Sequence, residues 1–129
     1  MNEPIFLSLQ HVRLIHQRSF AEHGGSDGTR DSGLVESALA SAKITFYYTQ
    51  HDLFEVAASC AFHLAEAQAF IDGNKRTGVA SAMVFLAMNG VYTQPPKWEL
   101  YLAMIDVAQK RKTKADLAAI FSKCAEAAG

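Results

Sequence analysis

Two nearly all-apolar segments, residues 53–67 and 74–89, are separated by one short loop, and this arrangement constrains the fold more than any other feature. Apolar side chains cover most of the circumference that each segment has as a helix, which predicts two helices buried on most sides. Asp52, followed three residues later by Glu55, is typical of a helix N-terminus. Asn89-Gly90 is typical of a helix C-terminus. The sequence therefore predicts a helical core built from this pair.

Further segments show the spacing of amphipathic or short helices. They are residues 7–22, 34–40, 98–109 and a last segment that begins after Thr113. Residues 45–48 and 91–93 are the candidates for extended structure, at most a small β-hairpin or edge. The sequence thus predicts an all-α fold, a compact bundle of about six helices, in a single domain over residues 1–129.

The charge balance argues against some classes of partner. Lys and Arg number 12 and Asp and Glu number 13, so no overall positive field attracts nucleic acid or an anionic membrane. The basic run at 110–114 is expected to be a solvated loop between helices rather than a contact to a phosphate backbone. No apolar run reaches the roughly 18 residues of a membrane span, and the N-terminus lacks a signal-peptide pattern. We therefore expect a cytoplasmic protein without a membrane or nucleic-acid partner.

Two other features leave alternatives open. Cys60 and Cys124 lie far apart in apolar, Ala-rich stretches and are expected as buried thiols in a reducing compartment, with a disulfide between them as the alternative. The glycine-rich stretch at 24–28 is expected either as a flap over a site or as a plain surface loop.

The stretch from Gln68 to Gly78 concentrates the chemistry of the sequence. A loop that contains Gly73 leads directly into the second buried helix. Backbone N–H groups at a helix N-terminus, together with the helix dipole, form a ready site for an anion. Lys75 and Arg76 lie in the first turn, where cations oppose that dipole, so we expect an anion beside them.

Neighbouring side chains suit a phosphate site. Asp72 offers the hard carboxylate oxygen that Mg²⁺ prefers, and Asn74 suits either a helix cap or a bond to a phosphate oxygen. Phe70 is expected to anchor the loop in the core. The alternative is a plain interhelical turn over 72–74, which explains those three residues but not Lys75-Arg76. The spacing differs from that of a Walker A loop.

Residues 70–77, Phe-Ile-Asp-Gly-Asn-Lys-Arg-Thr, closely resemble the signature of the Fic/Doc (Fido) superfamily. Lys75, Thr77 and Val79 match the death-on-curing (Doc) branch of toxins rather than the Fic branch. Residues 29–39 and the chain length are also similar to that branch. The resemblance therefore extends over nearly the whole chain.

The resemblance implies a role for each signature residue. Asp72 would hold Mg²⁺ against the phosphates of ATP or another nucleotide. Lys75 and Arg76 would neutralise the charge that develops during transfer. The residues implied to bind the nucleotide are Phe70, Gly73, Asn74, Lys75, Arg76 and Thr77.

The resemblance also implies an activity and partners. Death-on-curing toxins transfer the terminal phosphate of ATP to a hydroxyl of elongation factor Tu, a protein of the translation machinery, whereas Fic relatives transfer AMP. The partner in such a toxin–antitoxin module is an antitoxin protein. We expect its C-terminal segment to fold as a helix into an apolar groove.

Gln68 departs from the family pattern, because the signature starts with a His two residues before the Phe. That His is the general base, and Gln has no titratable group near neutral pH. Losing a general base typically lowers the rate by about 10²–10⁴-fold, so we expect impaired activity. Gln68 is either an engineered change or a natural variant.

Two alternatives to a toxin that transfers a phosphoryl group stay open. One is an inactive pseudoenzyme that binds nucleotide or antitoxin, and the other is a Fic-like enzyme that transfers AMP. His63 lies five residues upstream and about 140° around the helix, so it is expected as a core or edge histidine rather than a substitute base.

Overall fold

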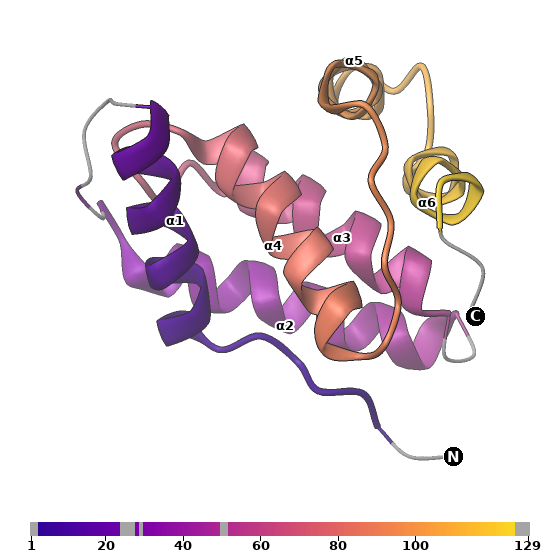
Figure 1. The fold of residues 1–129 in the computed structure, drawn as a ribbon, viewed down its shortest axis with the longest axis horizontal. Helices are drawn as coiled ribbons and strands as arrows, with labels where there is room; N and C mark the ends of the chain where they lie inside the picture. Colours follow the sequence, from indigo (N-terminus) through magenta and orange to yellow (C-terminus); the bar gives the residue numbers. More distant parts are fainter. Residues whose placement is uncertain (1–2, 24–27, 29, 50–51, 126–129) are drawn as a thin grey trace.

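The computed structural model describes residues 3–23, 28, 30–49 and 52–125. Within that part the chain forms six helices, which confirms the predicted all-α bundle. Figure 1 shows how they are arranged. The predicted flap or surface loop at 24–28 lies outside the described residues except for Gly28. The helices are α1 (Leu9–His23), α2 (Ser32–Tyr48), α3 (Leu53–Ala67), α4 (Asn74–Met88), α5 (Lys97–Ala108) and α6 (Lys114–Lys123).

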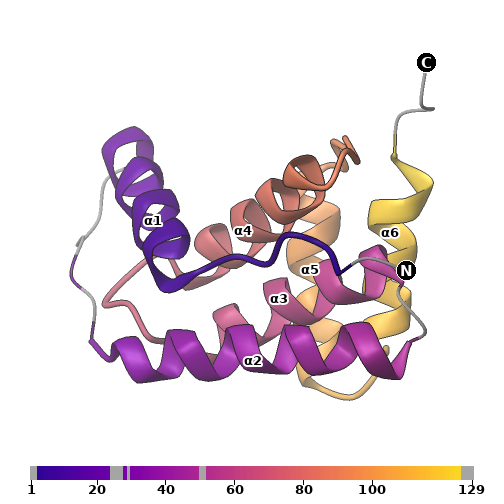
Figure 2. The same ribbon diagram turned by 90° about the horizontal axis from the view of Figure 1, so that it is seen from below.

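Helix α3 is the centre of the bundle. It packs against α2, α4 and α6, and Figures 1 and 2 show these helices around it. Residues 56–61 of α3 are all buried, as the apolar pattern predicted. A Cβ added at Gly78 of α4 would lie 2.5 Å from the carbonyl oxygen of Ala61. The missing side chain at Gly78 therefore lets α3 and α4 approach closely, and this close pair carries the loop between them.

Two helix starts follow the predicted capping residues. The Asp52 carboxylate accepts hydrogen bonds from the amides of Phe54 at 2.9 Å and Glu55 at 3.1 Å. Thr113 and Asp116 form a reciprocal capping box at the start of α6. Because such caps depend only on residues within one turn, they can be predicted from local sequence.

Helix α2 is longer than the sequence indicated. The predictions of a short helix at 34–40 and of extended structure at 45–48 were wrong, because α2 continues to Tyr48. Its buried residues share the spacing of one helix face, and burying that face outweighs the strand preference of aromatic and β-branched residues. These buried residues are Val35, Ala38, Ala42 and Phe46.

The segment at 91–93 contacts the end of α6. Thr93 forms an isolated antiparallel bridge with Ala125, and its hydroxyl donates to the Phe121 carbonyl at 2.8 Å. In the described part of the chain this bridge takes the place of the β-hairpin that the sequence allowed.

The two cysteines are not bonded to each other. Cys60 is buried in α3, and burial raises the pKa of its thiol to about 12. Cys124 is only half-buried after the end of α6. The expectation of buried thiols is therefore confirmed for Cys60 and corrected for Cys124.

Among the described helices, none has the length and apolar character needed to cross a lipid bilayer.

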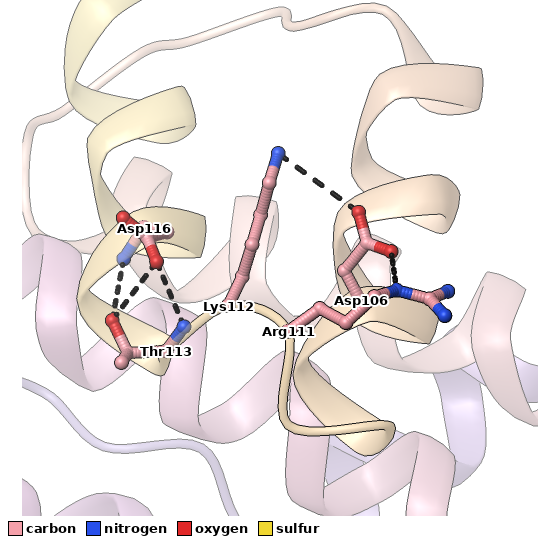
Figure 3. A network of polar contacts seen from close by, with 5 residues as sticks. All are labelled: Asp106, Arg111, Lys112, Thr113 and Asp116. Atoms are coloured by element: carbon pink, nitrogen blue, oxygen red, sulfur yellow. Dashed lines mark hydrogen bonds and ion pairs between the residues drawn. The ribbon is translucent and has the colours of Figure 1, made fainter.

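The basic run at 110–114 covers the turn from α5 into α6. Figure 3 shows two of its residues, Arg111 and Lys112, on either side of Asp106. Arg111 Nε lies 3.0 Å from Asp106 Oδ1, and Lys112 Nζ lies 3.9 Å from Asp106 Oδ2. Exposed pairs of this kind add little stability, but they partly neutralise the run. The position between two helices agrees with the predicted solvated loop.

Candidate functional site

The loop between α3 and α4, residues 68–73, begins and ends with a left-handed backbone. Gln68 closes α3 with φ 50°, and Gly73 precedes α4 with φ 75°. Glycine adopts this conformation freely, whereas a residue with a Cβ is strained there and must be held by its surroundings. Gln68 is exposed. We call residues 68–73 the site loop.

The segment that precedes α2 pairs with the site loop through the main chain. The Ala69 carbonyl accepts from the amides of Arg30 at 2.6 Å and Asp31 at 3.1 Å. The Ile71 amide donates to the Gly28 carbonyl at 3.0 Å. These bonds join two stretches that the sequence had singled out separately.

Asn74 fastens the site loop to the start of α4. Its Oδ1 accepts from the Phe70 amide at 3.1 Å, and its Nδ2 donates to the Phe70 carbonyl at 3.1 Å. The sequence allowed a cap or a phosphate ligand at this position. In the structure the side chain shapes the loop, while the main-chain amide of Asn74 belongs to the first turn of α4.

His16 of α1 contacts the site loop and was not identified from the sequence. Its ring stacks on Phe70 with centroids 4.0 Å apart and planes 8° apart, and its Nε2 lies 2.8 Å from the Asp72 carbonyl oxygen. His16 is 3% exposed and Phe70 is 1% exposed. The sequence offered one signal for a buried His16, its place one helical turn after the apolar Val12. That spacing is equally typical of a histidine that is simply part of the core.

Asp72 and Gly73 form the exposed end of the site loop. The Asp72 carboxylate accepts from the Gly73 amide at 2.8 Å, and Asp72 itself is exposed. The first helical bond of α4 runs from the Thr77 amide to the Gly73 carbonyl at 2.9 Å. The amides of the first turn precede that bond and have no partner within the helix, as at every helix start.

Arg76 and Lys75 point into different hollows. Arg76 lines a cavity of about 510 Å³ between α1, α4 and α5, which we call the α1/α4/α5 cavity. Lys75 lines a separate hollow of about 190 Å³ with residues of α3 and α5, among them Phe62 and Met104. The sequence predicted that both cations bind phosphates, and in the structure their side chains line two different hollows.

The α1/α4/α5 cavity combines apolar walls with positive charge. Arg18, Arg76 and Lys97 line it beside apolar residues such as Val84. Tyr101 also lines it, and burial raises the pKa of its hydroxyl while the Arg76 charge works in the opposite direction. Such a cavity favours a ligand that carries both negative charge and apolar surface.

Residues 6–86, which run from before α1 into α4 and include the site loop, match the Fic/DOC family. This chain belongs to the Fic/DOC family. The matched region of this Fic/DOC protein includes both the site loop and residues 70–77, which resemble the family signature.

Two relatives of this Fic/DOC chain carry names. It is 34% identical over 86 residues to "Protein kinase doc" of Escherichia phage P1. This alignment covers 66% of this chain and 68% of the relative. It is 41% identical over 70 residues to "Toxin Doc" of Mycolicibacterium smegmatis. This alignment covers 53% of this chain and 54% of the relative. The second match thus spans about half the length of that relative.

Two signature residues of this Fic/DOC protein are not at the surface. Phe70 and Thr77 are 1% and 0% exposed. The Thr77 hydroxyl has no hydrogen-bond partner among the described residues. Their side chains therefore support the loop and α4 from within.

His63 is engaged on another side of α3. The Lys114 ammonium lies 3.0 Å from His63 Nε2, which must accept because an ammonium only donates. Burial, and then the Lys114 charge, lower the pKa of His63. This partly buried histidine is thus bound to α6, in keeping with its predicted place at the core or its edge.

Proposed function

We propose that this Fic/DOC protein is the toxin of a toxin–antitoxin module and moves a phosphoryl group from ATP to a hydroxyl of a protein target. The names of its relatives, a protein kinase and a toxin, support the proposal. By resemblance the target is elongation factor Tu, and the activity would belong to the cytoplasm. One observation carries the proposal: Asp72, the left-handed Gly73 and the first turn of α4 meet at one accessible loop.

The residues present fit a magnesium nucleotide. Asp72 is exposed and supplies a hard carboxylate oxygen. Gly73 has a positive φ of 75°, which strains residues that have a Cβ, and a Cβ there would lie 3.0 Å from the Arg76 guanidinium, so glycine keeps this part of the loop uncrowded. Asp72 would hold Mg²⁺, and the first-turn amides of α4 together with Arg76 would hold phosphate oxygens. Bound Mg²⁺ would supply charge neutralisation at the transferred phosphoryl group.

Arg76 is the cation best placed to stabilise the transferred charge. It is half-buried at the edge of the α1/α4/α5 cavity, where charge interactions are stronger than in bulk water. Lys75 is exposed and lines the other hollow, so we assign it the smaller part.

Gln68 would limit the rate of this reaction. Gln68 caps the end of α3 and begins the site loop, at the position where the family signature has its general base. Gln can orient a hydroxyl by hydrogen bonding but cannot take its proton. The neutral, exposed side chain at this position favours a second candidate function, a pseudoenzyme that binds nucleotide and antitoxin without turnover.

An antitoxin segment would occupy the α1/α4/α5 cavity. Its apolar walls, with Leu14 and Val84, fit the apolar face of an amphipathic helix. Arg18 and Lys97 at the same cavity would pair with acidic side chains of that helix.

Restoring the base tests the proposed function. We would compare the chain with Gln68→His and Gln68→Asn, because histidine and asparagine both tolerate left-handed backbone and only histidine titrates. Each protein is incubated with purified elongation factor Tu, Mg²⁺ and ATP labelled at either the α- or the γ-phosphate.

The expected result is transfer of γ-label that rises by about 10²–10⁴-fold in Gln68→His and stays at the starting level in Gln68→Asn. Transfer of α-label would replace the kinase proposal with AMP transfer. Binding of Mg·ATP without transfer by any variant would favour the pseudoenzyme. Absence of both binding and transfer would refute the nucleotide site.

A further inference from the structure

His16 of α1 contacts the centre of the site loop, but the proposed mechanism gives it no role. The ring is parallel to Phe70 at 4.0 Å, and Nε2 lies 2.8 Å from the Asp72 carbonyl oxygen. Because a carbonyl oxygen only accepts, Nε2 must carry the hydrogen and donate it. His16 is 3% exposed, so this donor is held away from competing water.

The contact fixes one peptide group at both ends. The Asp72 carbonyl and the Gly73 amide belong to the same planar peptide, so they turn together. His16 holds the carbonyl at 2.8 Å, and the Asp72 carboxylate accepts from the Gly73 amide at 2.8 Å. If the carbonyl were released, the peptide could rotate and the carboxylate would lose its fixed direction.

We propose that His16 is a positioning residue of the site. By holding the Asp72–Gly73 peptide, it orients the Asp72 carboxylate and the entry into α4 before a phosphate-bearing ligand and its metal arrive. The proposal rests on the nucleotide function proposed above. Partners that orient a metal-binding carboxylate typically change metal affinity or activity by about 10–100-fold when they are removed.

Two substitutions separate the two contacts of His16. His16→Phe keeps a ring against Phe70 and removes the hydrogen-bond donor. His16→Gln keeps an Nε2 donor on a side chain of similar reach and removes the ring. Gln17→Ala, at an exposed position of the same helix, is the control.

The first readout is the affinity for Mg·ATP, measured by titration calorimetry. The free energy of unfolding of each variant is measured as well, so that affinity and stability can be compared. We expect His16→Phe, which keeps the ring contact with Phe70, to lose only part of the stability and to bind about 10–100-fold more weakly than the parent protein. We expect His16→Gln to be less stable and to bind more tightly than His16→Phe. Affinity that follows stability across the variants, or normal affinity in His16→Phe, would overturn the positioning role.

The second readout needs no nucleotide. Hydrogen exchange of the Gly73 amide, followed by NMR, is expected to speed up in His16→Phe and to stay slow in His16→Gln and Gln17→Ala. If Mg·ATP binds to none of the proteins while Gly73 exchange behaves as expected, the nucleotide function is wrong and the control of the peptide by His16 stands. Unchanged Gly73 exchange in His16→Phe would overturn the inference itself.

Discussion

Lys75 and Arg76 are adjacent in the sequence but line separate hollows, one beside α3 and the other between α1, α4 and α5. Successive residues of a helix point about 100° apart, so neighbouring cations at a helix start face different sides. Their roles in ligand binding are therefore separable by mutation.

Arg76→Ala is expected to weaken Mg·ATP binding by about 10–100-fold, the range for loss of a hydrogen bond to a charged group. Lys75→Ala is expected to change affinity by less than about 3-fold, because an exposed charge is screened by solvent. Calorimetric titration of both variants, with circular dichroism to verify folding, provides the measurement. Equal loss in the two variants would show that the cations act together after all.

Gly78→Ala is expected to destabilise the protein by about 1–3 kcal/mol, although alanine is the better helix former. The reason is the approach of 2.5 Å that a Cβ would make to the Ala61 carbonyl oxygen. Ser81→Ala on the same helix is the matched control. Its hydroxyl is buried without a partner among the described residues, so its removal is expected to leave stability equal or higher. Urea unfolding of both variants tests the close approach of α3 and α4.

The histidine bound to α6 gives a pH dependence of known sign. Burial and the Lys114 charge lower the pKa of His63 from its ordinary 6.5. The unfolded chain therefore binds more protons than the folded chain below about pH 6.5, and stability falls as the pH drops through this range.

We expect the loss of stability between pH 7.5 and pH 5 to be smaller in His63→Gln than in the parent protein. Lys114→Gln is expected to raise the pKa of His63 toward its ordinary value, which NMR titration measures. An identical pH profile for the parent and His63→Gln would contradict this account.

The two thiols are expected to differ in reactivity. The pKa of the buried Cys60 is raised to about 12, so little thiolate exists near neutral pH. Cys124 is half-buried and should react first with a thiol reagent at pH 8. We expect one rapid equivalent in the folded protein, lost in Cys124→Ser, and the second only after denaturation. Two rapid equivalents would show that Cys60 is accessible.

Features that depend on local sequence were predictable. The bounds of α3 and the start of α4 follow from the apolar pattern and from Asp52 and Gly73. The end of α2 was missed because Phe46 and Tyr47 prefer strands, and only packing against α3 decides that they are helical. The buried residues of α2 do share the spacing of one helix face, Val35, Ala38, Ala42 and Phe46, but that spacing becomes decisive only once α3 covers the face.

The site shows the same division between local and distant causes. The directions of Lys75 and Arg76 follow from helix geometry and were available from the sequence. The contact between His16 and Asp72 joins residues 56 apart in the chain, and no spacing rule predicts it. The bond from Asn74 to Phe70 was equally hidden, because an asparagine at a helix start is most simply a cap.

The pairing of Gly28, Arg30 and Asp31 with the site loop has a kinetic consequence. These bonds close long stretches of chain, from 28–31 to 69–71, across the whole of α2 and α3. Closing such a long loop costs entropy that is recovered only once the intervening helices have docked. During synthesis on the ribosome, α2 and α3 are therefore expected to dock first, and only then can Arg30 and Asp31 pair with the site loop.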